Sequence, residues 1–204
     1  MNTAIQELEK MSKSGKPFLI VGKGRSFKPD FKDFDKYNVL SINDTMYYAK
    51  NSIGLYSIAF NDFQVLASIH IDGVNKMFCP SHAASGALKK TTDISFLMDV
   101  VTNFQNKKIP NIYTFNYNQN SFYNQELGPI IHAYNSTYES TIWLLAHAGV
   151  KNVFTMGIDF DQEHHPIFGL PPSPVPYAAM KYYAQVAIDY YKMNVQPLSD
   201  GRGS

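Results

Sequence analysis

Short apolar runs that end in glycine or a small polar residue constrain this chain most, because they recur between segments with helical spacing. The clearest runs are "PFLIVG" (17–22), "YNVLSIND" (37–44) and "KNVFTMGIDFD" (151–161). Such runs are typical of strands buried on both faces of a parallel sheet. Segments 135–149 and 177–194 have the spacing of amphipathic helices. The alternation predicts an α/β fold with three layers and a mostly parallel sheet.

The remaining elements follow from the same patterns. Residues 3–12 are expected to form a short helix, with Ile5, Leu8 and Met11 on one side. Further strand-like runs cover 76–80, 111–117 and 195–199, and 93–106 has helical spacing. The mixed runs over 53–60 and 63–72 could be a strand or a helix plus a strand. Pro197 indicates an edge strand. With no internal repeat or linker, residues 1–204 are expected to form a single domain.

Composition excludes several classes of protein. Hydrophobic residues make up 45% and charged residues 17% of the chain, which is typical of a globular protein and not of a disordered one. The net charge of +1 lacks the strongly basic balance of nucleic-acid-binding proteins. A single cysteine, Cys79, excludes an internal disulfide and favours a reducing compartment. No segment approaches the ~20 apolar residues of a membrane span, so we expect a cytoplasmic protein.

The turn after the first strand has the composition of an anion site. Gly22 and Gly24 allow close backbone approach and exposed amides, Lys23 and Arg25 add positive charge, and Ser26 adds a hydroxyl. These groups together suit a phosphate or pyrophosphate. The turn is neither a Walker A sequence nor the full G-x-G-x-x-G pattern, and an ordinary tight turn after a strand remains the alternative.

A second polar group stands at the start of the helix over 135–149. Asn135, Ser136 and Thr137 precede or begin it, and Ser136 and Glu139 are in capping-box register. A helix N-terminus favours an anion, although capping alone explains these residues equally well. Gly149 stands where a C′ glycine belongs.

The run "GIDFDQEHH" is the densest cluster of chemically active residues. Asp159 and Asp161 alternate, so on an extended segment they point the same way and could share a Mg²⁺ or Mn²⁺ ion bridging to a diphosphate. His164 or His165 could take a proton from an acceptor hydroxyl, since imidazoles titrate near neutrality. A solvated acidic loop is the alternative. The loop over 163–176 carries five prolines and is long enough for a lid.

Three stretches together resemble a known set of Rossmann-like proteins: "LIVGKGRSF", "VLSIND" and "NSTYESTIWLLAHAGVKNVFTMGIDFD". One branch comprises bacterial sialyltransferases that use a CMP-sugar, and another the flagellin glycosyltransferases of the motility-accessory-factor type. A third comprises archaeal-type pterin pyrophosphokinases. The resemblance implies a Rossmann-like fold and a nucleotide-activated substrate.

The resemblance also implies roles for individual residues. Gly22, Gly24 and Ser26 match the motif that holds the nucleotide phosphates, and Asn43 matches the asparagine that contacts nucleotide or sugar. The matches to the small turn and to the G-x-D motif are Asn135, Ser136, Thr137, Gly157 and Asp159. Arg25 stands where the family usually has proline, and Lys23 where the sialyltransferases have asparagine.

These inferences lead to a glycosyltransferase hypothesis. Its donor would be a nucleotide sugar, with Asp159 and a histidine catalytic and Asp159 and Asp161 the metal ligands. The acceptor stays open among glycan, protein, lipid head group and modified nucleic-acid base. A Mg²⁺-dependent pyrophosphokinase and a non-catalytic nucleotide-binding module are the alternatives. The C-terminal tyrosines, at 182, 183, 190 and 191, either fill the core or meet a second copy of the chain.

Overall fold

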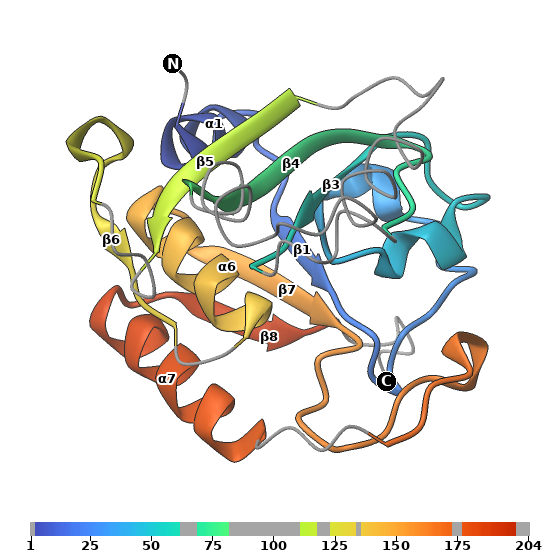
Figure 1. Ribbon diagram of the computed structural model, residues 1–204. Helices are drawn as coiled ribbons and strands as arrows, with labels where there is room; N and C mark the ends of the chain where they lie inside the picture. The colour runs from blue at the N-terminus through green and yellow to red at the C-terminus, as the bar shows by residue number, and fades with distance from the viewer. Residues whose placement is uncertain are drawn as a thin grey trace, which may run out of the picture.

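One open sheet organises the protein (Figure 1). The computed structural model describes residues 3–61, 69–81, 111–117, 123–133, 136–172 and 177–198. Within these ranges the strand order is β6-β5-β4-β3-β2-β1-β7-β8, and every pairing between neighbouring strands is parallel. The predicted parallel α/β sheet is therefore confirmed. The predicted helix over 93–106 lies outside the described residues.

The strands are Phe18–Val21 (β1), Asn38–Ile42 (β2), Tyr56–Ala59 (β3), Val74–Pro80 (β4), Asn111–Tyr117 (β5), Ile130–Ile131 (β6), Asn152–Met156 (β7) and Asn194–Pro197 (β8). The α-helices are Ala4–Ser12 (α1), Thr137–His147 (α6) and Tyr177–Tyr190 (α7). Short 3-10 turns cover Phe34–Lys36 (η1), Thr45–Ala49 (η2), Gln125–Leu127 (η3) and Pro166–Phe168 (η4).

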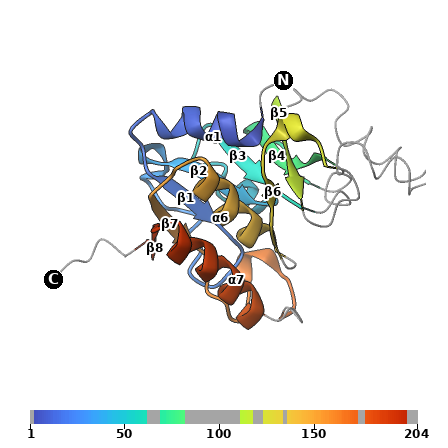
Figure 2. The ribbon, with the colours of Figure 1, turned by 90° about the vertical axis from the view of Figure 1, so that its left-hand side faces the viewer.

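Alternating side chains of the strands build two hydrophobic layers. In β1, Phe18 and Ile20 pack into the cluster that contains α1, α6 and α7, so these helices cover one face of the sheet (Figure 2). Leu19 and Val21 point to the other face, where the described cover consists of 3-10 turns and loops. Since β1 is buried on both faces, its sequence is apolar throughout, as a central parallel strand requires.

Residues predicted to cap a helix lie at the two ends of α6. The Ser136 hydroxyl accepts the Glu139 amide at 3.1 Å, as the capping register predicted. At the other end of α6, Gly149 has a φ of 71° and its amide donates to the Ala146 carbonyl. The next amide, of Val150, donates to the Leu145 carbonyl, which completes a Schellman motif.

Two predicted boundaries were wrong. Helix α7 ends at Tyr190 and not at Asn194, because Lys192 adopts a left-handed φ of 51° and the Asn194 amide begins β8 by donating to the Lys151 carbonyl. The strand predicted over 63–72 is absent from its described part, 69–72, because the chain turns through Gly73 before β4. Edge position was confirmed for β8, which pairs with β7.

The strand order places a topological switch point between β1 and β7. From β1 the chain proceeds through β2 to β6 in one direction, then returns to place β7 and β8 on the other side of β1. In open parallel sheets, ligands bind outside the carboxyl ends of the strands where the order reverses. The residues that follow β1 and β7 are therefore the first place to examine.

Candidate functional site

The turns after β1 and β7 are in direct backbone contact. Gly157 has a φ of 66°, and a Cβ built there would lie 2.8 Å from the carbonyl carbon of Gly22. The Gly24 amide donates to the Gly157 carbonyl at 2.8 Å, and a Cβ on Gly24 would lie 2.9 Å from that same oxygen. Glycine is required at these positions because any side chain would separate the two turns.

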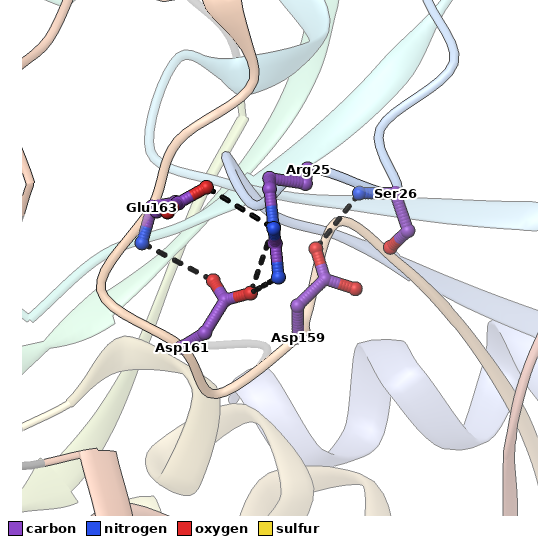
Figure 3. Close-up of polar contacts among 5 residues, drawn as sticks. All are labelled: Arg25, Ser26, Asp159, Asp161 and Glu163. Atoms are coloured by element: carbon purple, nitrogen blue, oxygen red, sulfur yellow. Dashed lines mark hydrogen bonds and ion pairs between the residues drawn. The ribbon is translucent and has the colours of Figure 1, made fainter.

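Ser26 fastens the two turns from the other side (Figure 3). Its amide donates to the Asp159 carboxylate at 2.8 Å, and its hydroxyl oxygen accepts the Gly157 amide at 2.9 Å. The predicted anion nest therefore has internal partners, since the Gly24 and Ser26 amides both bind the β7 turn. The Ser26 amide, which the sequence assigns to a phosphate, donates here to a carboxylate of the chain itself.

The two cations of the β1 turn have acidic partners. Lys23 Nζ lies 2.9 Å from Asp44 Oδ1, at the end of β2. Arg25 Nε donates to Asp161 Oδ2 at 2.9 Å, and its terminal nitrogen lies 3.1 Å from Glu163 (Figure 3). The hydrogen bond to Asp161, followed by the charges of Asp161 and Glu163, raises the pKa of Arg25 above its ordinary value.

The predicted Mg²⁺ or Mn²⁺ site does not fit this arrangement. Asp159 accepts a backbone amide and Asp161 holds a guanidinium, so the two carboxylates serve separate partners. Among the described residues, no group of three or more His, Cys, Asp or Glu side chains is arranged to hold a metal ion. We therefore derive no chemical step through a metal.

A cavity of about 300 Å³ lies at the switch point. This volume is at the lower end of the range for small-molecule sites, roughly 300–1,000 Å³. The predicted site residues that line it are Gly22, Lys23, Gly24, Asn43, Ser136, Thr137, Gly157, Asp159, Asp161 and His164. Arg25, Ser26 and His165 are not among its lining residues. Asn135 lies outside the described residues.

Several lining residues escaped prediction because they are apolar or aromatic. They are Ile42, Tyr138, Ile158, Phe160, Tyr177 and Met180. Phe160 has a left-handed φ of 56°, an uncommon conformation for a bulky residue, and its ring packs edge-on against Tyr138 at 5.3 Å. Strain of this kind clusters at functional sites. The sequence offered one signal that could have found two of them, since Ile158 and Phe160 flank the predicted site residue Asp159.

The two adjacent histidines have different environments. His164 lines the cavity, and its Nδ1 lies 3.0 Å from the Pro171 carbonyl oxygen. Because a carbonyl only accepts, His164 Nδ1 donates, which puts the lone pair of the neutral ring on Nε2. His165 Nδ1 instead accepts the Ile167 amide at 3.2 Å, and its ring packs against Phe27. The geometry favours His164 as the proton acceptor.

Asn61 orders the start of α6, a role that the sequence did not indicate. Its amide nitrogen donates to the Ser136 carbonyl at 3.0 Å, and its amide oxygen accepts the Ser140 hydroxyl at 2.7 Å. The same nitrogen lies 3.3 Å from the Tyr117 hydroxyl. Burial, with the nearby Glu139 carboxylate, raises the pKa of Tyr117 to about 12, so this hydroxyl stays neutral. The first turn of α6 is thereby fixed beside the cavity.

Comparison with known proteins gives little guidance. No protein-family model matches the chain, and no curated protein matches it. Among solved structures, it is similar to the crystal structure of the sialyltransferase CST-II in complex with a trisaccharide acceptor and CMP. The two share 15% identity over 90% of this chain and 81% of that chain, with a TM-score of 0.46. A likeness at this level says nothing about activity.

Within the described part of the chain, no helix is suited to crossing a bilayer.

Proposed function

We propose that this protein transfers a sugar from a nucleotide-activated donor to an acceptor hydroxyl, in the cavity between β1 and β7. One observation carries the proposal: a cation, a helix N-terminus and an imidazole surround a single cavity at the switch point of a parallel sheet. These are Lys23, the start of α6 at Ser136 and Thr137, and His164. Helix N-termini and cations favour phosphate, and this location is where such sheets bind nucleotides.

Each lining residue has a distinct task in the proposed reaction. Lys23 and the first turn of α6 bind the donor phosphate, and Asn43 contacts the base or the sugar. His164 Nε2 takes the proton of the acceptor hydroxyl as its oxygen forms the new glycosidic bond. The bond between the sugar and the phosphate breaks, and its electron pair leaves with the nucleotide phosphate, whose charge Lys23 stabilises.

Nucleotide binding provides the first test. We would screen CMP, UDP, GDP and ADP, and their sugars, by thermal shift with and without Mg²⁺ or Mn²⁺. A ligand at 100 times its Kd should stabilise the fold by about 2.7 kcal/mol, so a donor is readily seen. If none of these compounds shifts the transition, the proposal fails. Binding of ATP with Mg²⁺ and release of AMP would instead indicate phosphotransfer.

Substitution of the histidines tests the chemistry. His164→Gln should lower turnover of the donor by about 10²–10⁴-fold, the usual contribution of a positioned base. His165→Gln is the matched control, because its ring caps η4 and does not line the cavity. Equal losses in the two variants would remove His164 from its role, and binding without turnover in the unaltered protein would indicate a nucleotide-binding module.

A further inference from the structure

Residues 158–165, here called the wall segment, connect β7 to the cavity and to the β1 turn. Asp159, Asp161 and His164 of this segment line the cavity. The segment is not attached only through β7. His164 forms an isolated antiparallel bridge with Gly24, and the His165 amide donates to the Lys23 carbonyl at 2.9 Å. The wall segment is thus joined to the β1 turn by one backbone bridge and one backbone hydrogen bond.

Arg25 fastens the outer side of the same contact (Figure 3). Its guanidinium binds Asp161 through two nitrogens and reaches Glu163 with a third. The Asp161 carboxylate also accepts the Glu163 amide at 3.2 Å, which orders the two acids relative to each other. The Arg25 side chain is 59% exposed and does not line the cavity, so its contacts are to the wall segment and not to the cavity interior.

We propose that Arg25 is a positioning residue that latches the wall segment to the β1 turn, and so sets how often this side of the cavity opens. The role differs from the phosphate contact predicted from the sequence. Exposed ion pairs are individually weak, so the latch opens readily and biases the segment without locking it. That this opening controls how a ligand enters and leaves the cavity rests on the proposed function. The contact between Arg25 and the wall segment does not.

The charges that line the cavity explain why a cation is needed at the position of Arg25. Among the described residues that line it, Asp159, Asp161 and Glu163 are acidic, whereas Lys23 is the cation and is paired with Asp44. An anionic ligand would therefore meet repulsion from the wall segment. Arg25 neutralises two of these acids from outside and favours the arrangement in which His164 lines the cavity.

Hydrogen exchange of the His165 amide measures the latch without any ligand, because this amide is protected by its bond to the Lys23 carbonyl. Arg25→Gln should increase its exchange rate by about threefold to tenfold, which is the effect of losing one or two exposed ion pairs. Amides of α6 and β4 should keep their rates. In the unaltered protein, 1 M NaCl should act in the same direction by screening the pairs.

Lys36→Gln is the matched control, since Lys36 is similarly exposed and pairs with Asp33, and neither residue lines the cavity. It should leave the His165 amide unchanged. The exchanged pair Arg25→Asp with Asp161→Arg should restore protection that Arg25→Asp alone removes. The proposal is overturned if Arg25→Gln and Lys36→Gln give the same exchange at His165, or if the charge exchange restores nothing. Should Arg25→Gln fail to fold, the absence of a salt effect on the unaltered protein overturns it equally.

Discussion

Strands β1 and β7 border a hollow at each of their ends, and the two hollows differ in chemistry. At the carboxyl ends, the cavity of about 300 Å³ is lined by carboxylates, a lysine, an imidazole and a helix N-terminus. At the amino ends, a larger hollow of about 600 Å³ is lined among the described residues by glycine, lysine, uncharged polar and apolar residues. Its two lysines, Lys16 and Lys151, donate to backbone carbonyls of Asp35 and Tyr191.

The comparison shows that the volume of a hollow does not identify the functional site in this fold, because the larger hollow has the less reactive lining. In a parallel sheet, every strand delivers the residues that follow it to one edge, so side chains far apart in sequence converge there. The amino edge receives the residues that precede the strands. In this protein those residues belong to the turns that lead into the strands. The larger hollow accordingly lacks acids and imidazoles among its described lining residues, and its cations close the ends of loops.

The largest expected contrast is between two left-handed glycines, one at each edge. Gly149 and Gly157 have φ values of 71° and 66°, but a Cβ on Gly149 would have nothing within 4 Å. Gly149→Ala should therefore cost about 1–2 kcal/mol of the free energy of unfolding, the ordinary price of this conformation. Gly157→Ala also forces the two turns apart and should cost about 3–5 kcal/mol. Urea unfolding measures both, and equal losses would contradict the close packing of the two turns.

Two lysines provide the next contrast. Lys23→Ala should weaken the nucleotide that gives the largest thermal shift by about tenfold, which corresponds to one charge-assisted hydrogen bond of about 1.4 kcal/mol. Lys151→Ala, at the amino edge, should leave the affinity unchanged. Titration calorimetry compares the two variants. A larger loss with Lys151→Ala would move the nucleotide site to the other hollow.

The smallest effect concerns a histidine away from both hollows. Burial, and then the nearby charge of His132, lowers the pKa of His147 below its ordinary value near 6.5. The unfolded chain then binds a proton that the folded chain resists, so stability is complete above about pH 6.5 and falls as the pH drops below it. Urea unfolding at pH 7.5 and 5.5 should show a smaller pH effect for His147→Gln than for the unaltered protein. The same dependence in both would exclude His147.

The fold and the location of the site were accessible from sequence for one physical reason. Strand β1 is apolar throughout because it is buried on both faces, and in a parallel sheet the residues after β1 and after β7 lie at the same edge. The convergence of Gly24 with Gly157 and of Lys23 with His164 on one cavity also requires that β7 lie beside β1, which the structure shows.

The sequence could not show which side chains of the site pair with each other. Arg25 and Asp161 are 136 positions apart, and nothing in their composition distinguishes a pair from two ligands for a phosphate and a metal. The roles of His164 and His165 are separated only by which backbone group each Nδ1 meets. The C-terminal tyrosines also differ: Tyr191, just after α7, packs on Trp143 at 5.9 Å, whereas Tyr182 and Tyr190 are exposed, so the oligomer stays a prediction.

The position of β7 beside β1 has a consequence for biosynthesis. Strand β1 leaves the ribosome well before its neighbour β7, which is translated more than a hundred residues later. At about 5–20 residues per second, one edge of β1 waits on the order of ten seconds for its partner. The nascent chain therefore presents one unpaired edge of an apolar strand for that interval, and the cavity can form only after β7 has been translated.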